Sequence, residues 1–145
     1  MKPEKDLLEL SRKVIQSYFE GKEIEADDKI KKKYSEKLAC FVTLTKNGNL
    51  RGCIGSLYAH QPLYKDVIDN TINAAFRDYR FVPLDESELS SVKIEISILS
   101  TAKKLNFSPA DDLLKKLNHS MGVILKKGPY SATYLPQVWE ELPNK

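Results

Sequence analysis

Hydrophobic residues recur along this chain at two different spacings, and each spacing predicts a different element. In residues 3–20 the apolar positions repeat every three or four residues, which is the period of an amphipathic helix. The same period returns over residues 62–77, where Pro62 suits the first helical turn. A third, shorter helix is expected after Ser108, a good N-cap, and Pro109, which suits the first helical position.

Strict alternation of apolar and polar residues marks the strands. It runs through residues 38–45 and again through residues 92–99, so one face of each strand is expected in the core. Asn47-Gly48 supplies the positive φ angles of a tight hairpin turn, and a return strand begins near Leu50. A second hairpin is expected over residues 121–135.

The predicted order is helix, hairpin, helix, strand, helix, hairpin. Antiparallel strands with helices between them favour an α+β fold, in which an antiparallel sheet built from hairpins is packed by helices. The two hairpins belong either to one sheet or to two subdomains. In the second case, a cleft between a larger and a smaller subdomain is the default ligand site.

Composition and charge narrow the functional classes. The chain has 145 residues, of which 41% are hydrophobic, and its net charge of +3 comes from 23 basic and 20 acidic residues. That balance does not indicate nucleic-acid or membrane binding. The lysine run at residues 29–33 is interpreted as a solvated face, with phosphate contact as the alternative. No apolar run approaches the ~20 residues of a membrane span.

The cysteines and histidines do not form a recognisable metal site. Cys40, Cys53, His60 and His119 lack zinc-ligand spacing, and the chain has neither a phosphate loop nor a dinucleotide fingerprint. No metal site is predicted and no cofactor is identified. A disulfide is allowed by the count of two cysteines, but no signal peptide precedes them, so a cytoplasmic location with free thiols is the simpler expectation.

The candidate chemistry is concentrated in residues 50–55, Leu-Arg-Gly-Cys-Ile-Gly. Arg51 offers a planar fork of donors for carboxylate or phosphate and would favour the thiolate of Cys53. Gly52 and Gly55 allow close approach of another group. The alternatives are a cysteine buried as a small hydrophobe and glycines that mark a bulge or bend. His60 is either a base for Cys53 or a solvated loop residue.

Four segments resemble the AMMECR-one domain family, whose prokaryotic members are called AmmeMemoRadiSam system protein A. The first is Leu-Arg-Gly-Cys-Ile-Gly itself. Residues 75–83 look like the family's A-F-x-D-x-R-F-x-P segment, residues 94–99 look like its central strand, and residues 133–138 look like its L-P-Q-V segment. They follow in family order from about residue 5 to the end of the chain.

The resemblance implies a fold, a site and a setting. The family fold is α+β with a larger and a smaller part, and the segment from Arg51 to Gly55 lines a cleft between them. The chain is therefore expected to be one domain over residues 3–145. Its C-terminal part is expected to be truncated, because family members run on for some tens of residues. Memo-like and radical S-adenosylmethionine (radical SAM) proteins are the partners implied, in a cytosolic modification system.

Three functional hypotheses remain. In the first, the chain is an enzyme component in which Cys53 is the nucleophile or covalent carrier and Arg51 binds the anionic part of a substrate. The other cleft residues of this hypothesis are Gly52, Ile54, Gly55, Asp78, Arg80 and Glu95. In the second, the chain is a non-catalytic module that binds a small anion, a peptide or a protein, with Arg51 as the anchor. Nucleic-acid binding ranks lowest. Whether the chain is an enzyme stays open.

Overall fold

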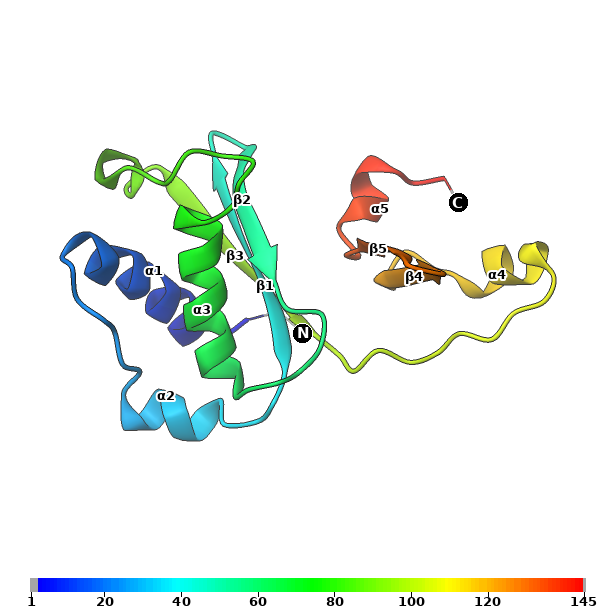
Figure 1. Ribbon diagram of the computed structural model, residues 1–145, viewed down its shortest axis with the longest axis horizontal. Coiled ribbons are helices and arrows are strands. Elements are labelled where there is room, and N and C mark those ends of the chain that lie inside the picture. The colour runs from blue at the N-terminus through cyan, green and yellow to red at the C-terminus, as the bar shows by residue number, and fades with distance from the viewer. Residues whose placement is uncertain (1–2, 145) are drawn as a thin grey trace. The chain divides into compact units, whose positions relative to one another are not determined.

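A computed structural model describes residues 3–144, which form two compact units (Figure 1). The first unit ends at Thr101 and the second begins at Ala102. In chain order the elements of the first unit are α1 (Lys5–Phe19), α2 (Asp28–Lys33), β1 (Ala39–Lys46), β2 (Asn49–Gly55), α3 (Leu63–Phe76), the 3-10 helix η1 (Glu86–Glu88) and β3 (Val92–Leu99).

The first unit is an antiparallel three-stranded sheet with helices on one face. The strand order is β2-β1-β3, and α1 and α3 lie side by side against the same face of the sheet (Figure 1). Cys40, Val42 and Leu44 of β1 point into the core between sheet and helices, where they are fully buried. The intervening residues of β1 point to the opposite face, as the alternation predicts.

A tight turn and a bulge fix the β1–β2 hairpin. Asn47 and Gly48 have φ angles of 52° and 77°, which confirms the predicted turn. The register then shifts at Leu44, because two residues of β2, Arg51 and Gly52, occupy the space of one.

The second unit is a two-stranded hairpin with short helices at its ends. Its elements are α4 (Ala110–Lys116), β4 (Val123–Lys127), β5 (Tyr130–Tyr134) and α5 (Val138–Glu141). The Trp139 indole donates to the Met121 carbonyl at 2.9 Å and stacks on His119, with 5.0 Å between ring centroids. No residue of 102–144 is fully buried.

The fold class agrees with the sequence, since the chain is α+β with antiparallel sheets. The two hairpins lie in separate sheets, one in each unit. Helix α4 begins at Ala110 with Pro109 as its N-cap, one residue later in the chain than predicted. The sequence does not predict the short helix α2, because its charged segment, residues 23–37, buries only Ala26, Ile30 and Tyr34. In residues 3–144 no helix is long and apolar enough to cross a membrane.

Candidate functional site

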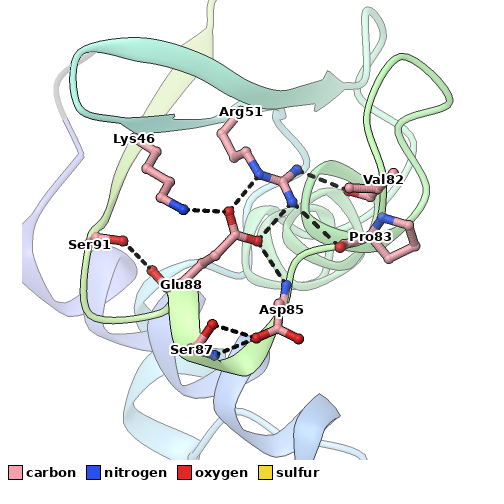
Figure 2. Close-up of polar contacts among 8 residues, drawn as sticks. All are labelled: Lys46, Arg51, Val82, Pro83, Asp85, Ser87, Glu88 and Ser91. Carbon is pink, nitrogen blue, oxygen red and sulfur yellow. Dashed lines mark hydrogen bonds and ion pairs between the residues drawn. The ribbon is translucent and has the colours of Figure 1, made fainter.

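The Arg51 guanidinium is engaged within the protein, as Figure 2 shows. Its Nε and Nη2 atoms donate to the two carboxylate oxygens of Glu88 at 3.0 and 2.9 Å, and its Nη1 donates to the Val82 carbonyl at 3.0 Å. A longer bond of 3.4 Å joins Nη2 to the Pro83 carbonyl. Every nitrogen of the guanidinium has an acceptor, so binding an external anion would require Arg51 to give one up.

Glu88 is the acceptor on which these donors converge (Figure 2). Lys46 Nζ donates to its Oε1 at 2.9 Å, and the Asp85 N–H donates to its Oε2 at 3.0 Å. The bonds from Arg51 are the largest cause that lowers the pKa of Glu88, from an ordinary 4.5 to about 2. The Arg51 and Glu88 side chains are only 13% and 15% exposed, so the pair fixes the segment after α3 to the end of the sheet.

The bulge separates Arg51 from Cys53. Arg51 and Gly52 together stand opposite Leu44, and a bulge re-aims the side chain of its additional residue. Arg51 consequently reaches Glu88, whereas Cys53 follows the regular alternation onto the other face of the sheet. Although Arg51 and Cys53 are only two residues apart, Arg51 is therefore not the cation beside the thiol.

The two glycines are required by close packing. A Cβ on Gly52 would overlap the carbonyl oxygen of Ala74 in the last turn of α3, and a Cβ on Gly55 would overlap the ring of Phe41 on β1. Ile54, between them in β2, packs against the core. These contacts account for the spacing Gly-x-x-Gly without a ligand.

The backbone of Cys53 is held by two side chains from residues 77–83, the loop after α3, called here the 77–83 loop. Because β2 is an edge strand, the Cys53 N–H and C=O that point away from β1 have no strand partner. Asp78 Oδ2 accepts the N–H at 3.0 Å, and Arg80 Nη2 donates to the carbonyl at 3.1 Å. The two side chains thus take the place of a neighbouring strand.

Asp78 and Arg80 also form a bidentate pair. Arg80 Nε donates to Asp78 Oδ1 at 3.0 Å, and Nη2 donates to Oδ2 at 2.7 Å. The bond from Arg80 is the largest cause that lowers the pKa of Asp78 to about 2. Asp78 in turn raises the pKa of Arg80, with smaller contributions from the nearby Cys53 and Tyr79. Arg80 is therefore the cation beside Cys53.

The Cys53 thiol lies on the sheet face opposite α1 and α3. Its Sγ is 3.2 Å from Thr43 Oγ1, and the register places Thr43 between Cys53 on β2 and Glu95 on β3. Cys53, Thr43 and Glu95 form one row across the three strands. Neither Cys53 nor Glu95 is buried, so a half-buried thiol and a carboxylate share this face.

The structure brings some sequence-predicted residues together and keeps others apart. Cys53, Asp78 and Arg80 are in direct contact, and Glu95 lies one strand beyond Thr43. The contacts of His60 are elsewhere: its Nδ1 lies 3.2 Å from the Tyr58 carbonyl oxygen, and its Nε2 lies 3.9 Å from Asp66. No group of metal-ligating side chains is found in the part of the chain that the structure describes.

Sequence reasoning missed the buried carboxylate of Asp66 on α3, which is 1% exposed. Its Oδ2 accepts from the Cys40 N–H at 2.9 Å and from Asn70 Nδ2 at 3.0 Å. Its Oδ1 accepts from Ser56 Oγ at 2.8 Å and from Gln61 Nε2 at 3.2 Å. The cluster ties the start of β1 and the chain after β2 to the first turn of α3.

The same cluster makes Cys40 an unreactive thiol. Burial is the largest cause that raises the pKa of Cys40 well above its usual range, and the Asp66 carboxylate raises it further. Cys40 is fully buried, whereas Cys53 is not, and both are free thiols. The two cysteines therefore differ in exposure, and the alternation over residues 38–45 already predicts that Cys40 shares a face with the apolar residues of its strand.

Acid is expected to destabilise the first unit between about pH 4.5 and pH 2. Asp78 and Glu88 have pKa values of about 2 in the folded protein, below their ordinary 3.8 and 4.5. The unfolded chain therefore binds these protons first, so the stabilisation is complete above the ordinary values and is lost as pH falls toward 2. Urea unfolding midpoints at pH 7, 4, 3 and 2 measure this loss.

Glu88→Gln is the comparison for the acid prediction. This variant loses the ion pairs with Arg51 and Lys46, so its urea midpoint is expected to be lower than that of the wild type at pH 7. Because glutamine does not titrate, the midpoint is expected to fall less between pH 4.5 and 2. A variant that lost as much stability with acid as the wild type would show that the Glu88 carboxylate is not responsible.

Comparison with known proteins finds a family model, relatives and a solved structure that are similar to this chain. The AMMECR1 family model matches residues 8–144. Protein NEQ441 of Nanoarchaeum equitans is 38% identical over 135 residues, covering 92% of this chain and 75% of that protein. Protein PYRAB00100 of Pyrococcus abyssi is 37% identical, covering 93% and 71%. The crystal structure of protein PH0010 from Pyrococcus horikoshii matches with a TM-score of 0.88 at 33% identity, covering 96% of this chain and 71% of that one.

Proposed function

Because this chain belongs to the AMMECR1 family, we propose that it is a cytosolic component of a modification system that acts with Memo-like and radical SAM proteins. We place its functional site at Cys53, within the segment from Arg51 to Gly55. One observation carries this assignment: Asp78 and Arg80 hold the N–H and the carbonyl of Cys53, while the thiol stays half-buried on the sheet face opposite α1 and α3.

The proposed role of Cys53 is that of a nucleophile or covalent carrier. A thiolate is the reactive form of cysteine, and a guanidinium next to it stabilises its negative charge. Arg80 supplies that guanidinium, and Asp78 orients it through the bidentate pair. Arg51, in contrast, acts through Glu88 to position the loop that carries these two residues.

A binding module is the second candidate function, with Arg80 instead of Arg51 as the anchor. One observation favours it. Arg51 has no nitrogen without an acceptor, but Arg80 Nη1 has no acceptor within residues 3–144, and the Arg80 side chain is 45% exposed. If the site only binds, an anionic group would dock on Arg80, and Cys53 would be a packing residue beside it.

Reconstitution with the proposed partners separates the two roles. The chain, a Memo-like protein and a radical SAM protein from one organism are purified, mixed with S-adenosylmethionine and analysed by size exclusion and intact mass. We expect a complex, and a mass increase on Cys53. Cys53→Ser, which retains a hydroxyl near Thr43, is expected to keep the complex and lose the adduct.

Two outcomes would count against the proposal. Absence of any complex would reject the partner assignment. A Cys53→Ser chain that gains the same mass as the wild type would reject the covalent role of Cys53 and favour the binding module.

A further inference from the structure

We propose that the 77–83 loop is a docking surface for an acidic segment of a partner protein. This inference does not depend on a reactive Cys53, because it concerns the outward side of the loop. The inward side of the loop holds the sheet edge, as described above. The exposed side chains of the loop include Tyr79, Val82, Arg77 and Arg80.

The backbone of the loop is fixed at both ends. Asp78 and Arg80 bind the Cys53 backbone, the Phe81 N–H donates to the Asp78 carbonyl at 3.0 Å, and the Leu84 N–H donates to the Ala75 carbonyl at 2.8 Å. Arg51 holds the carbonyls of residues 82 and 83 from the other side (Figure 2). A surface fixed before binding loses little conformational entropy when a partner docks.

The fixed loop exposes large apolar side chains. Tyr79 is 94% exposed, the highest value among the exposed large hydrophobic residues of 3–144, and Val82 is 75% exposed. Tyr79 lies between two anchored residues, Asp78 and Arg80, so the fold holds its backbone in place while its side chain stays exposed. Tyrosine and arginine are the residues most often responsible for binding energy at protein interfaces.

The charges of the loop specify the partner. Asp78 is buried, so the charges that the loop presents to solvent are the guanidinium groups of Arg77 and Arg80. Arg77 is exposed, and its guanidinium has no acceptor within the part of the chain that the structure describes. The next carboxylate, Asp85, accepts from the N–H and the hydroxyl of Ser87. A partner with carboxylates beside an apolar residue would complement this surface.

Charge favours a protein partner over a nucleic acid. Two arginines are too few for the phosphate contacts of a nucleic-acid site, and the chain as a whole carries only +3.

The test uses random twelve-residue peptides displayed on phage and selected against the whole chain. We expect selection of peptides with Asp or Glu next to apolar residues. Their affinity is then measured by fluorescence anisotropy for the wild type, Tyr79→Ser and Arg77→Ser. Each substitution is expected to weaken binding about tenfold or more without changing the thermal midpoint, because both side chains are exposed.

Tyr130→Ser is the matched control, because Tyr130 is 77% exposed in the second unit and the chemical change is the same. It is expected to bind the peptides as the wild type does. Selection of no peptides, of peptides without acidic residues, or of peptides that bind Tyr79→Ser unchanged would overturn the proposal. Tighter binding of a twelve-residue oligothymidylate than of any selected peptide would overturn it in favour of nucleic acid.

Discussion

Replacing Gly52 by alanine is expected to destabilise the first unit by about 3 kcal/mol or to prevent its folding. The added Cβ would overlap the carbonyl oxygen of Ala74, which belongs to the backbone of α3 and cannot rotate away. Relief would need β2 to move from α3, and this movement would also disturb Cys53 and the side chains that hold it. Urea unfolding followed by circular dichroism measures the change.

Gly21→Ala is the control for the Gly52 prediction. Gly21 has a φ of 67° and no atom within 4 Å of the position of a Cβ, so the substitution introduces backbone strain without a clash. It is expected to cost about 1 kcal/mol. If Gly52→Ala cost no more than Gly21→Ala, the close approach of β2 to α3 would not be the reason for the glycine.

Asp66→Ala is expected to have the second large effect, a loss of about 3 kcal/mol or more. The substitution leaves the buried Cys40 N–H without its acceptor, and a buried donor left unpaired costs about 1–3 kcal/mol. Asn70 Nδ2 loses its bond to Asp66 and keeps the Cys40 carbonyl as an acceptor at 3.2 Å. Ser56 and Gln61 lose the same acceptor. Urea unfolding measures the stability, and alkylation of Cys40 reports local opening.

Asp69→Ala provides the matched control on the same helix. Asp69 is exposed, and its one bond in the described structure comes from Gln61 at 2.9 Å. A loss within about 0.5 kcal/mol is expected, as is usual for surface positions. If the Asp66 and Asp69 variants were equally stable, the buried carboxylate would not be a structural anchor.

The parts of the fold that sequence predicts are those set by local rules. The alternation in β1 and β3 and the turn at Asn47-Gly48 depend on side-chain period and backbone φ, which a single segment carries. The same holds for α1 and α3, whose apolar stripes cover the sheet. For these elements the structure confirms the expectation within a few residues.

The candidate site was predicted less completely, because its geometry depends on contacts distant in sequence. Arg51 and Cys53 are two residues apart, yet the bulge opposite Leu44 sends Arg51 to Glu88. The glycines of β2 allow a bulge as one alternative, but the sequence does not show where the Arg51 side chain goes. The partner that approaches Cys53 instead is Arg80, 27 residues later. The role of Asp66 is not visible in the sequence, because three of its four donors, Cys40, Ser56 and Gln61, lie outside α3.

Alkylation of the native protein by iodoacetamide, with each cysteine followed by peptide mass spectrometry, shows whether the Cys53 thiol is accessible. Arg51 and the glycines of residues 50–55 build the fold, whereas we infer that the Cys53 thiol is left available for chemistry. We predict that Cys53 is labelled in the folded protein and that Cys40 is labelled only when the protein unfolds. Protection of Cys53 equal to that of Cys40, with both labelled only in denaturant, would contradict the claim and make Cys53 a structural residue.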